Sequence, residues 1–103
     1  RQISAITAKL AKYDGIPLSG RTVLFEVVNS AGRRSSLGYL EGKVAMLSVV
    51  TDSSGVAQTQ YYGPLKKEIR GNTDIYVRAT VVWEGTQHIQ DSIQLYIIRG
   101  DSD

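Results

Sequence analysis

The sequence predicts an all-β fold, an antiparallel β-sandwich of about seven strands. β-Branched and aromatic residues gather in short stretches, and no segment keeps the helical three-and-four spacing of apolar residues beyond about two turns. Glycine-rich and polar turn segments separate these stretches at regular intervals, as in two-sheet sandwiches. The 103 residues, 42% hydrophobic and 21% charged, match the composition of one globular domain.

The first half of the chain alternates between strands and turns. Strands are expected at residues 3–12 and 22–29, because apolar and polar side chains alternate there. The segment between them holds two glycines and a proline, which favours a turn. In the second strand Glu26 is placed outward, since an inward carboxylate would be buried without a partner. Val28 shares that outward position in the alternation.

The middle of the chain contains a long connection and an expected hairpin. Residues 30–43 lack periodicity and predict a connection with one short strand around 37–40. An apolar strand follows at 44–51. Asp52-Ser53-Ser54-Gly55 then predicts a tight turn, because glycine adopts positive φ without steric cost. We expect this turn to pair the apolar strand with the next strand, at 56–62.

The last two strands have the clearest alternation. Residues 74–83 predict a central core strand, and residues 87–98 predict the final strand. The domain is therefore expected to span 1–98, with 99–103 as a C-terminal linker or tail. The inward faces of the strands predict a core that contains Ile6, Leu10, Val23, Phe25, Val27, Tyr61, Val77, Val81, Trp83 and Leu95.

Three segments of the chain carry motifs found together in one known family. Residues 6–27 hold a strand, the turn Gly-Ile-Pro-Leu-Ser-Gly and then a Val-Leu-Phe strand, residues 51–57 read Thr-Asp-Ser-Ser-Gly-Val-Ala, and residues 75–81 alternate. In order and spacing they resemble the Gly-x-Pro-x-x-Gly turn, the Thr-Asp-x-x-Gly-x-Ala hairpin and the late strand of bacterial Ig-like domains of the invasin and intimin type. The resemblance covers residues 3–98 and implies an Ig-like antiparallel β-sandwich.

The resemblance also implies a function. Such modules serve as spacers, stalks or adhesive units in bacterial cell-surface or secreted proteins, so neighbouring Ig-like domains, a host receptor protein or a glycan are the expected partners. The family supplies no catalytic residues and no cofactor, and a non-enzymatic role is expected. The alternative is a carbohydrate-binding or accessory module of a secreted glycoside hydrolase, because fold alone does not fix function.

Composition excludes several other classes. Cysteine is absent, which excludes thiolate nucleophiles, thiolate zinc sites and iron–sulfur clusters. The net charge of +2 comes from dispersed basic residues among ten acidic ones, which argues against a nucleic-acid partner. Apolar stretches fall far short of the roughly 18 residues that a membrane span needs. The chain opens without a leader and is expected to be part of a longer protein.

Catalytic and metal-binding patterns are weak. The single histidine, His88, has no acidic partner at a recognisable spacing, and no Gly-x-Ser-x-Gly motif occurs. The aspartates are scattered rather than spaced as in calcium-binding loops. Asp14 and Asp52 are expected to form turns through their side chains. No metal site is therefore predicted, although a calcium ion bridging separate loops stays an open alternative.

Four tyrosines form the candidate ligand surface. Tyr76 and Tyr96 point outward in the expected register, on strands that neighbour one another in Ig-like sandwiches, and Tyr39 or Tyr62 would extend them into an aromatic platform for a sugar ring. The alternative is a cross-strand aromatic pair that only stabilises the sheet.

Arg99-Gly100-Asp101, followed by Ser102, matches the integrin-recognition tripeptide. Its place after the last strand predicts exposure. The same residues are ordinary linker composition, so a plain linker is the alternative.

Two groups of basic residues are candidates for binding polyanions such as glycosaminoglycan or lipopolysaccharide. Both groups contain a nearby glutamate and suit solvated loops equally well. They consist of Arg33, Arg34 and Lys43, and of Lys66, Lys67 and Arg70.

Overall fold

The computed structural model describes residues 2–12, 14–65, 73–82 and 88–97, and for 73, 82 and 88–97 it describes the backbone only. This part of the chain contains seven strands and no helix. The strands are β1 (Ile3–Lys9), β2 (Thr22–Val28), β3 (Tyr39–Leu40), β4 (Met46–Val50), β5 (Val56–Tyr62), β6 (Thr73–Val82) and β7 (His88–Ile97). The prediction of an all-β fold is confirmed for these residues.

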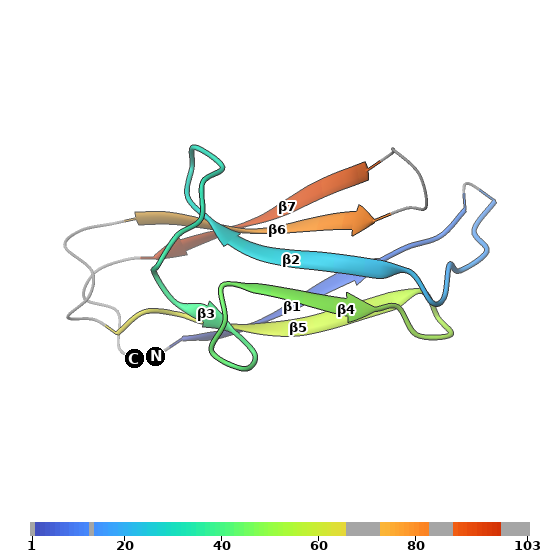
Figure 1. Ribbon diagram of the computed structural model, residues 1–103, viewed down its shortest axis with the longest axis horizontal. Helices are drawn as coiled ribbons and strands as arrows, with labels where there is room; N and C mark the ends of the chain where they lie inside the picture. Colours follow the sequence, from blue (N-terminus) through green and yellow to red (C-terminus); the bar gives the residue numbers. More distant parts are fainter. Residues whose placement is uncertain (1, 13, 66–72, 83–87, 98–103) are drawn as a thin grey trace.

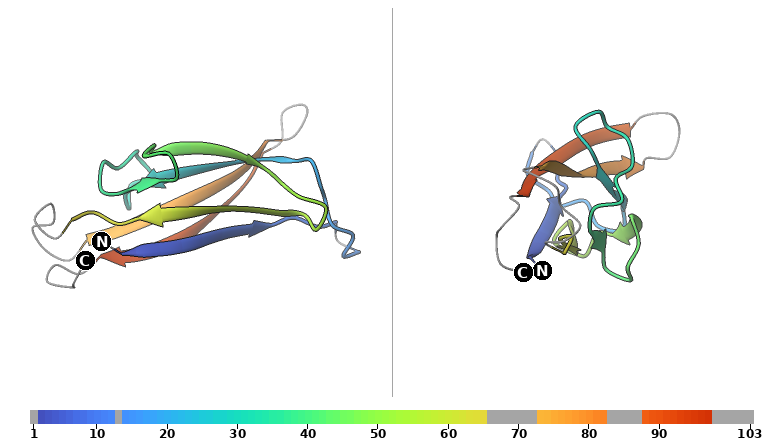
Figure 2. Two further views of the ribbon diagram at one scale, coloured as in Figure 1. Left: turned by 90° about the horizontal axis from the view of Figure 1, so that it is seen from below. Right: turned by 90° about the vertical axis from the view of Figure 1, so that its left-hand side faces the viewer.

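The strands form two antiparallel sheets, ordered β1-β5-β3 and β4-β2-β6-β7. The sheets lie face to face and make an elongated body of 44 × 24 × 23 Å (Figures 1 and 2). β6 lies between β2 and β7, which confirms its central position. β1 begins and β7 ends at the same end of the long axis (Figure 1).

The alternation identified most of the predicted core residues correctly where side chains are described, but the predicted core did not include the buried Leu40, Ala57 and Ile75. Val23, Phe25 and Val27 of β2 are fully buried, and Glu26 points outward, as expected. Leu10 is only partly buried against the core, while Trp83 and Leu95 lie outside the described side chains. The buried cluster draws on both sheets and consists of Ile6, Val23, Phe25, Val27, Leu40, Ala57, Tyr61, Ile75 and Val77. Burial of these apolar surfaces is the main force that holds the sheets together.

One polar group interrupts this apolar core. Thr59 is 0% exposed and pairs with Ile6 across the β1–β5 ladder, and its hydroxyl has no hydrogen-bond partner among the described residues. A buried hydroxyl without a partner destabilises the folded state, because it has lost its hydrogen bonds to water.

We expect Thr59→Val, which replaces this hydroxyl by a methyl group of similar shape, to raise the free energy of unfolding by about 1 kcal/mol. Urea unfolding of the purified chain measures the change. Thr7→Val, at an exposed position of the neighbouring strand, is the control and should change stability little. A loss of stability in Thr59→Val would contradict this reading of the core.

The expected hairpin between the fourth and fifth strands is wrong. β4 pairs with β2 in one sheet, whereas β5 pairs with β1 and β3 in the other. The turn itself forms as expected: Gly55 has a φ of 77°, and Asp52 Oδ1 accepts hydrogen bonds from the backbone N–H groups of Ser54 and Val56. This turn carries the chain from β4 in one sheet to β5 in the other.

The two turn motifs singled out in the sequence pack against each other. Residues 10–12, 14–20 and 51–55 form one end of the sandwich, here called the double-turn end. Thr51, only 4% exposed, donates its hydroxyl hydrogen to the Leu18 carbonyl at 2.7 Å and accepts from the Arg21 N–H at 2.9 Å. Its own backbone bonds to Gly20 and Arg21. Thr51 thus ties the Gly-x-Pro-x-x-Gly turn to the Thr-Asp-x-x-Gly turn.

Thr51→Val should lower the free energy of unfolding by about 2 kcal/mol, since it leaves the Leu18 carbonyl and the Arg21 N–H without this partner in a partly buried place. Thermal or urea unfolding measures the loss. Thr51→Ser retains the hydroxyl and should lose less than half as much. Equal losses in the two variants would show that the methyl group, not the hydrogen bonds, matters at this position.

The connection after β2 holds one short strand, β3, which confirms that expectation. Val28, expected outward and exposed, is only 3% exposed. The reason is that the chain folds back immediately: Val28 forms an antiparallel bridge with Arg34, and the Ser35 N–H donates to the Val27 carbonyl at 2.9 Å. The returning loop shields Val28, and its approach to the sheet creates a hollow.

Candidate functional site

The hollow is a shallow cleft of about 280 Å³ on the outer face of the β4-β2-β6-β7 sheet. β2 and β6 supply its floor, and the loop that follows β2 supplies its rim. We call it the Tyr76 cleft. Its lining residues are Val28, Asn29, Ser30, Gly32, Tyr76 and Arg78.

Asn29 shapes the rim of the cleft. Its side-chain Oδ1 accepts hydrogen bonds from the backbone N–H of Ala31 at 2.9 Å and of Arg33 at 3.1 Å. Its backbone also bonds to Arg33 and Gly32, and Gly32 has a φ of 77°, a conformation that glycine adopts at no steric cost. Asparagine and glycine thus close the loop tightly within a few residues.

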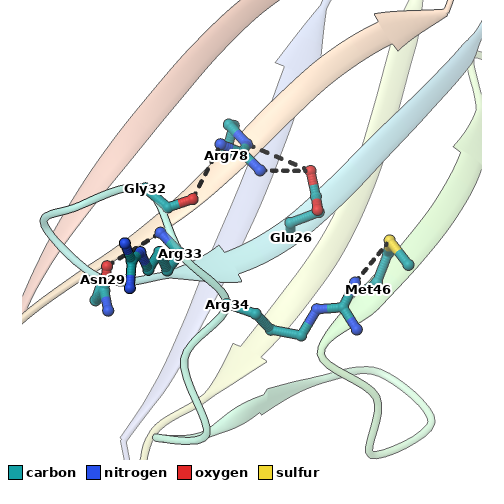
Figure 3. Close-up of polar contacts among 7 residues, drawn as sticks. All are labelled: Glu26, Asn29, Gly32, Arg33, Arg34, Met46 and Arg78. Atoms are coloured by element: carbon teal, nitrogen blue, oxygen red, sulfur yellow. Dashed lines mark hydrogen bonds and ion pairs between the residues drawn. The ribbon is translucent and has the colours of Figure 1, made fainter.

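Arg78 fastens this rim to the sheet. On β6 it lies opposite Glu26 of β2, and its Nε and Nη2 donate to Glu26 Oε1 at 3.3 and 3.1 Å. Its Nη1 donates to the Gly32 carbonyl at 3.3 Å (Figure 3). The side chains of Arg78 and Glu26 are 27% and 15% exposed. The guanidinium is therefore held in one orientation beside the cleft.

Glu26→Gln is expected to lower the free energy of unfolding by about 1 kcal/mol, because a partly exposed ion pair becomes a hydrogen bond to a neutral amide. Urea unfolding at low and at high salt measures this loss, which should shrink as salt screens the pair. Glu41→Gln, at an exposed position in the turn after β3, serves as the control and should change stability little. A loss that is independent of salt would contradict the electrostatic explanation.

The first basic group is only partly gathered. Arg33 lies beside Asn29 on the loop, whereas the side chain of Arg34 extends toward β4, where its Nη2 lies 3.6 Å from Met46 Sδ (Figure 3). Lys43 lies in the turn after β3, with a φ of 60°. Lys66, Lys67 and Arg70, which form the second group, lie outside the described residues. Binding of polyanions stays a prediction.

The structure separates the four candidate tyrosines. Tyr39 and Tyr62 are partners in the β3–β5 ladder and stack on each other, with ring centroids 5.4 Å apart. Tyr76 lies on the other sheet. The backbone of Tyr96 lies opposite Asp74, which is two residues from Tyr76 on β6. The side chain of Tyr96 is not among the described residues' side chains. Among the described side chains, Tyr76 alone of these tyrosines lines the cleft.

Arg99, Gly100 and Asp101 also lie outside the described residues, so recognition by integrins stays a prediction. Asp14 and Asp52 both accept hydrogen bonds from nearby backbone N–H groups, which confirms their expected turn-forming role. Within the described ranges, no group of three or more histidine, aspartate or glutamate residues is placed to hold a metal ion. No helix there has the length and apolar character to cross a membrane.

Sequence reasoning found Tyr76 but missed Asn29, Ser30 and Arg78. Two signals in the sequence point to them. Asn29 and Gly32 are separated by the short spacing of a side-chain-closed turn. Glu26 and Arg78 both have outward positions on expected strands, so an ion pair between neighbouring strands would join them. Neither signal identifies the cleft, because the fold-back of the chain after β2 is not visible in the alternation.

Comparison with known proteins adds no family assignment. No protein-family model matches the chain, and no curated protein is found to be similar to it.

Proposed function

We propose that this chain is a non-catalytic, Ig-like module of a bacterial cell-surface or secreted protein, where it acts as a structural spacer or an adhesion domain. The observation that carries the proposal is the double-turn end. The two turn motifs that resemble those of bacterial Ig-like domains are joined there through Thr51 and by the Leu10 N–H, which donates to the Gly55 carbonyl at 2.8 Å.

The surface and the core of the molecule support the same role, whereas its length of 44 Å does not, since β1 begins and β7 ends at the same end of the long axis (Figure 1). The outer face of the β1-β5-β3 sheet carries exposed glutamines and the half-buried Tyr39–Tyr62 pair, and the buried apolar cluster lies between the sheets, although Ile3, Met46 and Val50 are exposed. Such a body has the solvated outer surface and continuous core that a spacer needs.

Domain replacement in the parent protein tests the proposal. Cells that produce the parent protein are compared with cells in which this segment is deleted or is replaced by an unrelated β-sandwich of similar length. Antibody against the segment should label intact cells.

If the segment is a spacer, the unrelated sandwich restores the attachment that deletion abolishes. If it is an adhesion domain, only the original sequence restores attachment. Labelling that requires permeabilised cells would contradict a surface or secreted location.

The second candidate is a carbohydrate-binding module, the accessory role expected as the alternative. The Tyr76 cleft favours it, because an aromatic side chain, a fixed guanidinium and the side-chain amide of Asn29 line one shallow site. Titration of the chain with oligosaccharides tests this candidate, and loss of binding in Tyr76→Leu would support it.

A further inference from the structure

We propose that the Tyr76 cleft binds an acidic sugar residue, with the sugar carboxylate at Arg78 and Asn29. This inference rests on the carbohydrate-binding candidate above and names its ligand class. It follows from the donor groups that the cleft leaves unused, from the charges at its rim and from its size.

The cleft offers more hydrogen-bond donors than acceptors. An arginine has five N–H groups, and Arg78 uses three of them on Glu26 and Gly32, which leaves two. The Oδ1 of Asn29 is occupied by backbone N–H groups of the loop, so the part of its side chain left for a ligand is the amide N–H₂. The carbonyl of Gly32 already accepts from Arg78. A ligand that fits this site must supply acceptor oxygens.

Charge at the rim selects among such ligands. The Glu26 carboxylate offsets the charge of Arg78, and Arg33, which does not line the cleft, adds an exposed guanidinium beside Asn29 (Figure 3). Two guanidinium groups and one carboxylate thus lie at the cleft or near it. Asp74, two residues before Tyr76 on β6, is exposed and is not among the residues that line the cleft. A carboxylate can form charge-assisted hydrogen bonds with the remaining N–H groups of Arg78, which a neutral hydroxymethyl group cannot.

Size and shape restrict the ligand to one ring. The volume of about 280 Å³ is close to the lower limit of ordinary ligand pockets, roughly 300 Å³. The half-buried Tyr76 contributes an aromatic surface, and Val28, 3% exposed, contributes an apolar floor. The C–H face of a pyranose packs against such surfaces while its oxygens face the donors. A single uronic acid residue within a longer chain meets all three requirements.

Matched sugars test this proposal. The purified chain is titrated with trigalacturonic acid and with the corresponding neutral galactose trimer, which differ in the carboxylate, and binding is followed by calorimetry. We expect the acidic trimer to bind at least tenfold more tightly, and its affinity to fall as salt is raised. Arg78→Lys retains the charge but loses the planar donor pair, and should weaken the acidic trimer about tenfold.

Two further variants locate the site. Tyr76→Leu should abolish binding, whereas Tyr62→Leu, on the other sheet, should leave the affinity unchanged. Glu26→Gln removes the negative charge beside Arg78 and should keep or increase the affinity for the acidic trimer. Each variant is first shown to be folded by its unfolding transition. Because Glu26→Gln is expected to destabilise the chain slightly, tighter binding by this variant cannot arise from a general loss of structure.

The outcomes distinguish carbohydrate binding by the cleft from its preference for an acidic sugar. Equal affinity for both trimers, lost in Tyr76→Leu, overturns the acidic preference and keeps carbohydrate binding. Binding of an oligoglutamate peptide as tight as that of the acidic trimer shows a general attraction of anions and overturns the sugar assignment. If the affinity is unchanged in both Tyr76→Leu and Arg78→Lys, the ligand does not bind in the Tyr76 cleft and the proposed site is wrong. Absence of binding to either trimer overturns this inference, while the spacer or adhesion role is decided separately by domain replacement.

Discussion

Replacing Gly38 by alanine is expected to cost the fold about 3 kcal/mol or more. Gly38 has a φ of 79°, and a Cβ built there would overlap the Tyr61 hydroxyl and ring and the Tyr62 carbonyl oxygen. Tyr61 cannot move away easily, because it is 1% exposed and donates to the Leu37 carbonyl at 2.8 Å. The left-handed backbone costs an alanine about 1 to 2 kcal/mol, and overpacking adds roughly 1 to 3 kcal/mol.

Gly42→Ala is the matched control for this prediction. Gly42 has nearly the same φ, 81°, but an added Cβ there meets no atom within 4 Å. It should therefore lose only the backbone contribution of about 1 to 2 kcal/mol. Urea unfolding of both variants separates backbone strain from crowding. If Gly38→Ala is no less stable than Gly42→Ala, the close packing of Gly38 on Tyr61 is wrong.

Gly55→Ala should have the second largest effect, a loss of about 2 to 4 kcal/mol from the same two causes. Its φ is 77°, and an added Cβ would overlap the Leu10 carbonyl oxygen and lie 3.1 Å from the Leu18 N and 3.3 Å from the Pro17 Cβ. The strain falls on backbone atoms of the double-turn end. We expect faster hydrogen exchange at Leu10 and Leu18, whose N–H groups donate to Gly55 and Leu10.

Gly20→Ala provides the comparison at the same end of the molecule. Gly20 has a φ of 71° with no atom within 4 Å of an added Cβ, so its loss should be smaller. Hydrogen exchange read residue by residue shows where each variant loosens the structure. Unchanged exchange at Leu10 and Leu18 in Gly55→Ala would argue that the two turns are not packed as described.

Side-chain alternation predicted the strands and the core well because burial on one face is a local property of the sequence. In β5, the exposed Gln58 and Gln60 alternate with the buried Ala57, Thr59 and Tyr61, and the register leaves no other choice. The assignment of strands to sheets is not local. The apolar alternation of β4 fits pairing with β2 as well as with β5, so the alternation alone did not reveal that the turn at 52–55 changes sheets.

The candidate site was only partly predictable for a related reason. Tyr76 follows from the alternation of β6, since outward parity marks it as surface. Burial of Val28 and the position of Asn29 depend on the chain folding back after β2, which brings Arg34 opposite Val28. Arg78 is held by Glu26 of the neighbouring strand and by the Gly32 carbonyl, which that loop supplies. These are tertiary contacts, and the sequence pattern of either segment alone does not contain them.

The placement of the first and last strands decides how the sandwich would respond to tension. Since β1 begins and β7 ends at the same end, a pull applied between Ile3 and Ile97 acts across the strands rather than along them (Figure 1). It first meets the pairs Ile3–Tyr62 and Thr73–Ile97, and breaks each ladder one hydrogen bond after another instead of shearing many at once. A pull between Ile3 and Ile97 would therefore open the sandwich at low force, however well its interior is packed.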